Sequence, residues 1–248
     1  MKALGVIGYH HTGKTTVVTT LIRQLTKKGF RVATIKDIHA ENYHADTPGT
    51  NTWHHLQAGA CQVLAKGLHD SALLLPDAPE LKDIVKLLNG DFLIIEGLRS
   101  APVPKILCAE TIDQLEELYD DTIIAISGKL ASAGLDWSEP PVYDIFTQSE
   151  LLAQLVINKS FDLLPLNTPK DCSMCGLTCY DMATAILKGE KQRSDCLAEY
   201  SKSLQLKVDN AVIPLKPYVR KTLSDVLKAY LSNLNGVDIN QDITITIS

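Results

Sequence analysis

Residues 8–15, Gly8-Tyr9-His10-His11-Thr12-Gly13-Lys14-Thr15, fit the pattern G-x-x-x-x-G-K-[ST] of a phosphate-binding loop. Glycines in such a loop let successive backbone N–H groups point at phosphate oxygens. The lysine contacts the terminal phosphates, and the last hydroxyl is a magnesium ligand. The chain is therefore expected to bind a nucleoside triphosphate together with Mg²⁺. The residues expected to bind it are Gly8, His11, Thr12, Gly13, Lys14, Thr15 and Thr16, with Thr15 on the metal.

Two acidic residues follow predicted strands and are the candidate catalytic groups. Glu96 ends the apolar run Phe92–Ile95, where a second magnesium or water contact is needed, and Gly97 lets the backbone approach the phosphates. Asp37 ends a second predicted strand, at residues 31–36. The alternative is that both carboxylates are merely solvated acids at strand ends.

The elements that must position these residues alternate between strand and helix up to about residue 160. Apolar residues from Val17 to Leu25 recur at helical spacing, and Gly29 ends that helix. The other predicted strands are 1–7, 62–65, 72–75, 92–95, 105–108 and 122–126, and the other helices are 81–88, 112–119 and 149–157. This order predicts an α/β fold of the P-loop NTPase type, with a mostly parallel sheet and helices on both faces.

The remainder of the chain has a different character. Residues 161–171, which contain Pro165 and Pro169, are expected to link a nucleotide-binding domain at 1–160 to a second domain at 172–248. In that second part, alternating residues predict a hairpin at 204–215 and a last strand at 243–247, with an amphipathic helix at 219–234 between them. A small α+β unit is expected.

Composition narrows the class of protein. The chain has 248 residues, 45% of them hydrophobic, and a net charge of −5, which argues against nucleic-acid or membrane-surface binding. It shows no signal peptide and no apolar run long enough to cross a bilayer, so we expect a cytoplasmic protein. Cys61 and Cys108 lie in apolar contexts and are expected to be buried.

The other four cysteines, Cys172, Cys175, Cys179 and Cys196, are gathered in one segment, as expected of metal ligands in a reducing compartment. Three thiolates on one turn and a fourth beyond a helix suit a cubane cluster, whereas zinc more often takes two separated C-x-x-C pairs. The spacing resembles the four-cysteine [4Fe–4S] domain of corrinoid iron–sulfur protein large subunits. We prefer a [4Fe–4S] cluster, with zinc and unligated thiols as alternatives. Its role, as a structural staple or in redox chemistry, stays open.

A set of elements in residues 1–158 resembles the molybdopterin-guanine dinucleotide biosynthesis protein B family. Besides the phosphate loop it comprises Ile35-Lys36-Asp37-Ile38-His39, the D-x-P-G run at 46–49, Ala58-Gly59-Ala60 and Ile94-Ile95-Glu96-Gly97. The resemblance implies a GTP-binding protein, usually dimeric and weakly hydrolytic, which assists the guanylyltransferase that attaches GMP to molybdopterin. It also implies that Lys36, Asp37 and His39 line the nucleotide or pterin side of the site.

The chain departs from that family at two points. The family commonly has a histidine where this chain has Asp37, so a role that needs an imidazole there does not carry over. No N-K-x-D motif reads the base, although Ser127-Gly128-Lys129 lies where such a loop would be. The preference for guanine therefore rests on the resemblance.

Two other functions remain open. Four histidines between His39 and His55 would suit a nickel-type metal-insertion GTPase, although their irregular spacing favours a loop that moves around the nucleotide. The chain could also be a redox protein in which the nucleotide acts as a switch.

Overall fold

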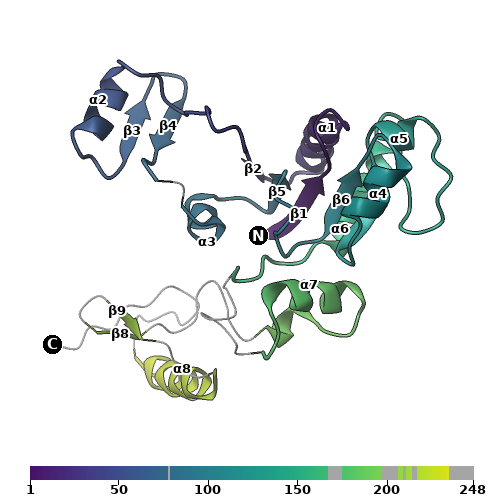
Figure 1. Cartoon of the computed structure of the whole chain (residues 1–248). Coiled ribbons are helices and arrows are strands. Elements are labelled where there is room, and N and C mark those ends of the chain that lie inside the picture. The colour runs from purple at the N-terminus through teal and green to yellow at the C-terminus, as the bar shows by residue number, and fades with distance from the viewer. Residues whose placement is uncertain (78, 167–174, 197–205, 209–210, 214–216, 235–248) are drawn as a thin grey trace.

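The core of the fold is a five-stranded sheet in which every neighbouring pair of strands is parallel (Figure 1). The structure is a computed structural model that describes residues 1–77, 79–166, 175–196, 206–208, 211–213 and 217–234. The strand order is β2-β5-β1-β6-β7, from β1 (Lys2–Ile7), β2 (Val32–Lys36), β5 (Phe92–Glu96), β6 (Lys105–Cys108) and β7 (Ile123–Ser127). The predicted parallel sheet is confirmed, and β1, which carries the phosphate loop, lies at its centre.

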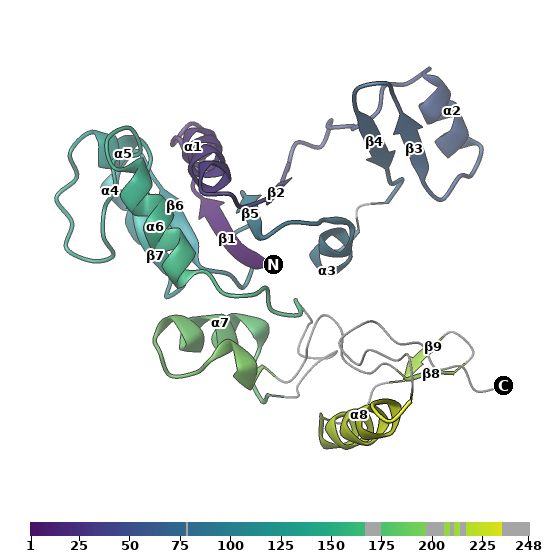
Figure 2. The same ribbon diagram turned by 180° about the vertical axis from the view of Figure 1, so that it is seen from behind.

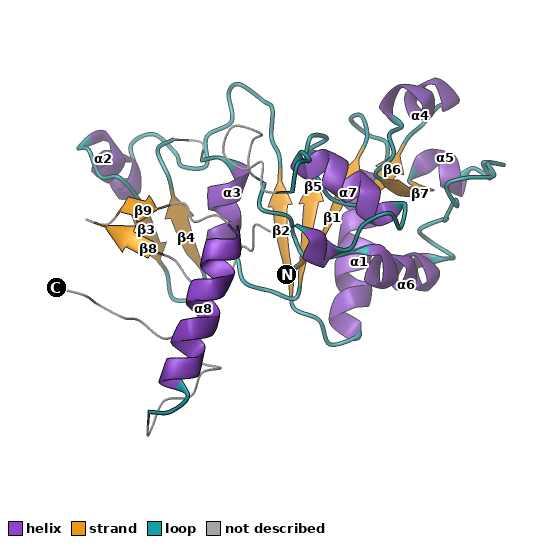
Figure 3. Cartoon of the chain, turned by 90° about the horizontal axis from the view of Figure 1, so that it is seen from below, coloured by secondary structure: helices purple, strands orange, loops and turns teal. Residues whose placement is uncertain are grey.

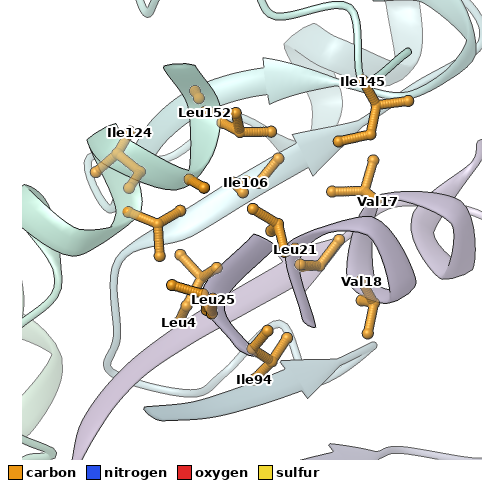
Figure 4. Packing of buried hydrophobic residues seen from close by; sticks show 14 of the residues in the cluster. Leu4, Val17, Val18, Leu21, Leu25, Ile94, Ile106, Ile124, Ile145 and Leu152 are labelled. Carbon is orange, nitrogen blue, oxygen red and sulfur yellow. The ribbon is translucent and has the colours of Figure 1, made fainter. Parts of the chain in front are cut away.

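Helices cover both faces of this sheet. On one face lie α1 (Lys14–Lys27) and α6 (Ser149–Lys159), whose apolar residues pack with Leu4, Ile94 and Ile106 in one buried cluster (Figure 4). The opposite face packs against α4 (Ile112–Leu118) and α5 (Lys129–Ser132). Because β1 and β5 are buried on both faces, their sequences are nearly continuous apolar runs.

The predicted strands at 62–65 and 72–75 do not join the sheet. They form a separate antiparallel pair, β3 (Val63–Lys66) and β4 (Ser71–Leu74), beside α2 (Asn51–Gln57). This hairpin module, residues 51–74, lies away from the main sheet in two opposite views (Figures 1 and 2). Helix α2 was not predicted from the sequence, although Thr50 accepts a hydrogen bond from the Trp53 backbone N–H as a helix N-cap does.

One helix and one cysteine also differ from expectation. The helix predicted at 81–88 is split into α3 (Leu81–Ile84) and the 3₁₀ turn η1 (Val85–Leu87). Of the two cysteines expected to be buried, Cys108 is buried but Cys61, at the junction of α2 and β3, is exposed.

The second part of the chain begins with α7 (Cys179–Leu187) and the 3₁₀ turn η2 (Arg193–Asp195). The predicted hairpin and long helix are present as β8 (Leu206–Val208), β9 (Ala211–Ile213) and α8 (Pro217–Leu231), which Figure 3 shows in a view turned by 90° from that of Figure 1. Residues 167–171 of the predicted linker and the strand predicted at 243–247 lie outside the described residues. The division into domains therefore stays a prediction.

No helix in the described part of the chain is long and apolar enough to cross a membrane.

Candidate functional site

The phosphate loop joins the end of β1 to the start of α1, and two of its glycines are required by geometry. Gly8 has φ of 148°, and a Cβ there would lie 2.1 Å from the Cys108 carbonyl oxygen. Gly13, with φ of 97°, is the N-cap residue of α1, so the unpaired N–H groups of the first helical turn face the loop. This end of a helix attracts anions, as a triphosphate site needs.

Lys14 is folded back onto the loop, where its ammonium donates a hydrogen bond to the Tyr9 carbonyl. Burial lowers the pKa of Lys14, and only smaller effects of neighbouring charges act on it. A phosphate in the loop would replace the carbonyl as acceptor and stabilise the charged amine. The side chain is thus placed for the role that the sequence predicts.

Thr12 has a different position from the other predicted loop residues. It is fully buried, and its Oγ1 donates to the Tyr9 carbonyl at 2.9 Å. Its own carbonyl accepts from the Lys129 backbone N–H at 3.0 Å. Thr12 therefore fixes the shape of the loop and ties it to α5, and its side chain does not line the pocket.

Glu96 Oε1 accepts hydrogen bonds from two other residues of the predicted site. Thr15 Oγ1 donates to this oxygen at 2.9 Å, and Lys36 Nζ donates to it at 2.6 Å. The Glu96 side chain is 8% exposed, whereas that of Lys36 is 58% exposed. A hydroxyl beside a carboxylate is the kind of oxygen donor set that Mg²⁺ prefers, so these residues fit the metal.

Asp37 lies beside this group. Its backbone N–H donates to the Glu96 carbonyl at 2.8 Å. His39 Nε2 is 3.1 Å from Asp37 Oδ2, yet this buried oxygen accepts no hydrogen bond from the described residues. Gly97, whose N–H donates to the Val6 carbonyl at 3.0 Å, packs against the Asp37 backbone. Asp37 thus offers an acceptor at the edge of the site.

These groups surround one cavity of about 1270 Å³ at the carboxyl ends of the strands. This is the edge where parallel sheets bind ligands. Of the predicted nucleotide and catalytic residues, all but Thr12 line the cavity: Gly8, His11, Gly13, Lys14, Thr15, Thr16, Lys36, Asp37, His39, Glu96 and Gly97.

The far wall of the cavity consists mostly of residues that no sequence motif marks. It contains Lys129, Ser132 and Phe146, and the Phe146 ring is 74% exposed. Asp144 holds this wall together by accepting from Ser132 Oγ at 2.5 Å and from Thr147 Oγ1 at 2.8 Å. No sequence pattern marks residues 144–147. Ile145 and Phe146 of this segment reach the cavity, because Val142 pairs with Ile126 of β7.

The described cysteines of the second part of the chain share one apolar cluster. Cys196 is buried there, and Cys175 and Cys179 pack against it with residues of α7. Cys179 begins α7, which Thr178 caps by accepting from the Asp181 N–H at 3.0 Å, and the positive end of a helix favours an anionic ligand. Cys172 lies outside the described residues. Thiol groups in apolar surroundings suit an iron–sulfur cluster.

No group of three or more His, Cys, Asp or Glu side chains forms a metal site among the residues that the structure describes. This includes the four histidines between His39 and His55, so nothing in the described structure adds to the nickel alternative. It also includes Cys175, Cys179 and Cys196, so their role as ligands stays a prediction.

The chain matches two family models. Residues 3–129, half of the chain, match "Molybdopterin guanine dinucleotide synthesis protein B", and residues 170–198 match "Putative Fe-S cluster". The second match covers all four predicted cysteine ligands.

Of two similar curated proteins, one spans the whole of this chain and the other spans half of it. A Methanocaldococcus jannaschii protein described as a "Putative molybdopterin-guanine dinucleotide biosynthesis adapter protein" is 28% identical over 100% of this chain and 97% of its own length. The Haemophilus influenzae molybdopterin-guanine dinucleotide biosynthesis adapter protein is 30% identical over 50% of this chain and 72% of its own.

A solved structure shows the same fold. The crystal structure of Bacillus subtilis MobB superposes with a TM-score of 0.55 at 22% identity, over 65% of this chain and 99% of that one. The family model matches residues 3–129, which include the phosphate loop and Glu96, and this match shows the family. The chain belongs to the molybdopterin guanine dinucleotide synthesis protein B family, with an Fe–S-type segment after the family domain.

Proposed function

We propose that this protein binds GTP and Mg²⁺ and acts as an accessory protein in the formation of molybdopterin guanine dinucleotide. The observation that carries the proposal is the meeting of Thr15 and Glu96 at 2.9 Å beside Lys14 in a single cavity. Relatives described as adapter proteins of this biosynthesis supply the process in which the site works.

Each residue has a separate task in this proposal. The N–H groups of the loop and the Lys14 ammonium would hold the phosphates. Thr15 and Glu96 would hold Mg²⁺, which would supply positive charge to the triphosphate. Asp37 orients the water for slow hydrolysis, because its buried Oδ2 has acceptor capacity to spare within the described residues. The cavity wall at Lys129 and Phe146 receives the base.

The second part of the chain adds a [4Fe–4S] cluster in this proposal. Cys172, Cys175, Cys179 and Cys196 hold it, and the cluster supplies a one-electron redox couple. The support is the family match over residues 170–198 and the packing of Cys175, Cys179 and Cys196 in one apolar cluster.

The partners are the guanylyltransferase that uses molybdopterin, molybdopterin itself and a second copy of this chain. The hairpin module supports the homodimer, since a two-stranded sheet is marginal alone and none of the α2 residues is buried. It also exposes Leu64, Leu68 and Leu73, by 65%, 99% and 42%. An exposed apolar surface of this kind is typical of an interface.

Equilibrium binding of GTP and ATP with Mg²⁺ tests the nucleotide proposal. The wild type is expected to bind GTP more tightly than ATP. Lys14→Ala removes charge-assisted hydrogen bonds of about 1.5–3 kcal/mol, so it should weaken GTP binding roughly 10- to 150-fold.

Lys27→Ala is the matched control, because Lys27 is an exposed lysine in the last turn of the same helix. It should leave the affinity unchanged within twofold. Equal affinity for GTP and ATP would remove the guanine preference. Failure of both nucleotides to bind with Mg²⁺ would overturn the proposed function.

A further inference from the structure

One carboxylate oxygen in the site accepts hydrogen bonds from two donors, of which one is neutral and the other is positively charged. Glu96 Oε1 accepts from the neutral Thr15 hydroxyl at 2.9 Å and from the Lys36 ammonium at 2.6 Å. Because the Glu96 side chain is only 8% exposed, its charge needs a nearby cation. In this structure Lys36 is the cation that contacts Glu96, and Lys14 also lies close enough to interact with its charge.

The two members of the ion pair are unequal in freedom. Glu96 ends β5, which is held between β1 and β2, and its carbonyl accepts from the Asp37 N–H. Lys36 ends β2, at the edge of the sheet, and its side chain is 58% exposed. A long, flexible ammonium side chain can swing away at little cost in packing, whereas the buried carboxylate cannot. Lys36 is therefore the mobile member.

The proposed function places Mg²⁺ at the same oxygen. Two cations at one carboxylate oxygen repel each other strongly in a partly buried site. Lys36 must then leave Glu96 when the metal arrives, and it needs a new anion. Lys36 ends β2 and lines the nucleotide cavity with Glu96 and Gly97. Lys129 and Phe146, where the base is placed, follow β7 at the opposite edge of the sheet, so the terminal phosphate is the nearest new partner.

We propose that Lys36 pairs with Glu96 in the absence of a triphosphate and moves to the terminal phosphate when GTP and Mg²⁺ bind. Lys36 is thus the residue by which the site distinguishes a nucleoside triphosphate from a diphosphate. This inference rests on the proposed function, since it needs a nucleotide in the cavity.

The first test compares the affinities for GTP and GDP, both with Mg²⁺, in the wild type, Lys36→Gln and Lys36→Arg. Lys36→Gln is expected to weaken GTP binding roughly 10-fold or more and GDP binding less than threefold, because only GTP offers the terminal phosphate. Lys36→Arg keeps the positive charge and should hold the ratio of the two affinities within threefold of the wild type.

The second test measures Mn²⁺ binding without nucleotide by electron paramagnetic resonance, with Mn²⁺ standing for Mg²⁺ as a cation of the same ligand preference. Lys36→Gln removes the competing ammonium, so Mn²⁺ is expected to bind at least fivefold more tightly. Lys86→Gln is the control: its exposed pair with Asp83 lies outside the cavity, and Mn²⁺ affinity should not change. If Lys36 had only a structural role, Lys36→Gln would not both weaken GTP binding and strengthen metal binding.

The outcomes distinguish a failure of the Lys36 inference from a failure of the proposed function. If the wild type binds GTP with Mg²⁺ but Lys36→Gln lowers the affinities for GTP and GDP equally, this inference is wrong and the proposed function stands. Unchanged Mn²⁺ binding in Lys36→Gln would also overturn the exchange. If the wild type binds neither nucleotide, both proposals fail.

Discussion

Two lysine–carboxylate pairs lie at opposite ends of the strands of the same parallel sheet, and the buried member is the carboxylate in one pair and the lysine in the other. At the nucleotide cavity, Lys36 ends β2 and is 58% exposed, while its partner Glu96 is 8% exposed. Where β6 begins, Lys105 is completely buried, while its partner Asp120 is 21% exposed and 3.4 Å away. In the first pair the anion is fixed and the cation can be replaced. In the second the cation is fixed.

The surroundings of Lys105 explain why a lysine is kept inside. Its ammonium lies 3.1 Å from the Tyr180 hydroxyl and 4.5 Å from the centre of that ring. Tyr180 belongs to α7 and follows the predicted cluster ligand Cys179, so Lys105 joins the sheet to the second part of the chain. Burial lowers the pKa of Lys105, and the charge of Asp120 opposes this effect. We call the buried contact of Lys105 with Asp120 and Tyr180 the fixed joint. The pair of Lys36 with Glu96, in which the lysine can be replaced by another cation, is the exchangeable site.

The largest effect that tests this contrast is expected from Asp120→Ala. It leaves a buried ammonium without its carboxylate and removes the hydrogen bond that Asp120 accepts from the Thr122 N–H at 2.8 Å. The free energy of unfolding in urea should fall by about 2–3 kcal/mol, near the lower end for breaking a buried pair because Asp120 is partly exposed.

The neighbouring residue provides the control. Asp121 pairs with Lys188 at 2.7 Å, but both side chains are about half exposed, so Asp121→Ala should cost less than about 1 kcal/mol. Adding Lys105→Met to Asp120→Ala should restore part of the lost stability, because it removes the unpaired charge. Equal losses in Asp120→Ala and Asp121→Ala would show that Lys105 is no fixed joint.

The pH dependence of stability tests the burial of two titratable groups on strand β6. Strand β6 begins with the buried amine of Lys105 and ends with the buried thiol of Cys108, whose pKa burial raises from 9.0 to about 12. Above pH 9 the unfolded thiol loses its proton while the folded one keeps it, so stability falls as pH rises from 9 towards 12. The lowered pKa of Lys105 acts in the opposite direction, since stability then rises with pH up to 10.5.

Cys108→Ala removes the first of these two effects. Unfolding in urea at pH 7.5 and at pH 10 should show that the wild type loses about 1 kcal/mol more than Cys108→Ala between the two values. Any packing loss from the smaller side chain is present at both values and cancels in the difference. Cys61→Ala, at an exposed position, should behave as the wild type does. If all three proteins lost stability in parallel, Cys108 would not titrate as its burial requires.

The sequence predicted the nucleotide site better than the joint, and the reason is physical. Phosphate binding requires particular residues at fixed spacing, so the loop, the strand that ends at Glu96 and the strand that ends at Lys36 could be recognised in order. The joint depends on Lys105 and Tyr180, which are 75 positions apart and follow no local pattern. The hairpin module was misplaced for a similar reason: alternation predicts a strand but not its partner.

The smallest expected effect is that of a change at the fixed joint on GTP affinity at the other end of the strands. Lys105 and Cys108 belong to the same short strand, and the Cys108 carbonyl lies against Gly8 of the phosphate loop, so a path between the joint and the nucleotide exists. A tightly packed sheet resists small shifts, however, and Tyr180→Phe keeps the ring over Lys105 while removing only its hydroxyl. We therefore expect Tyr180→Phe to lower stability by about 1–2 kcal/mol and to change GTP affinity less than twofold. Titrating GTP with Mg²⁺ into both proteins measures the second quantity, and a change of fivefold or more would mean that the fixed joint and the exchangeable site act as one unit.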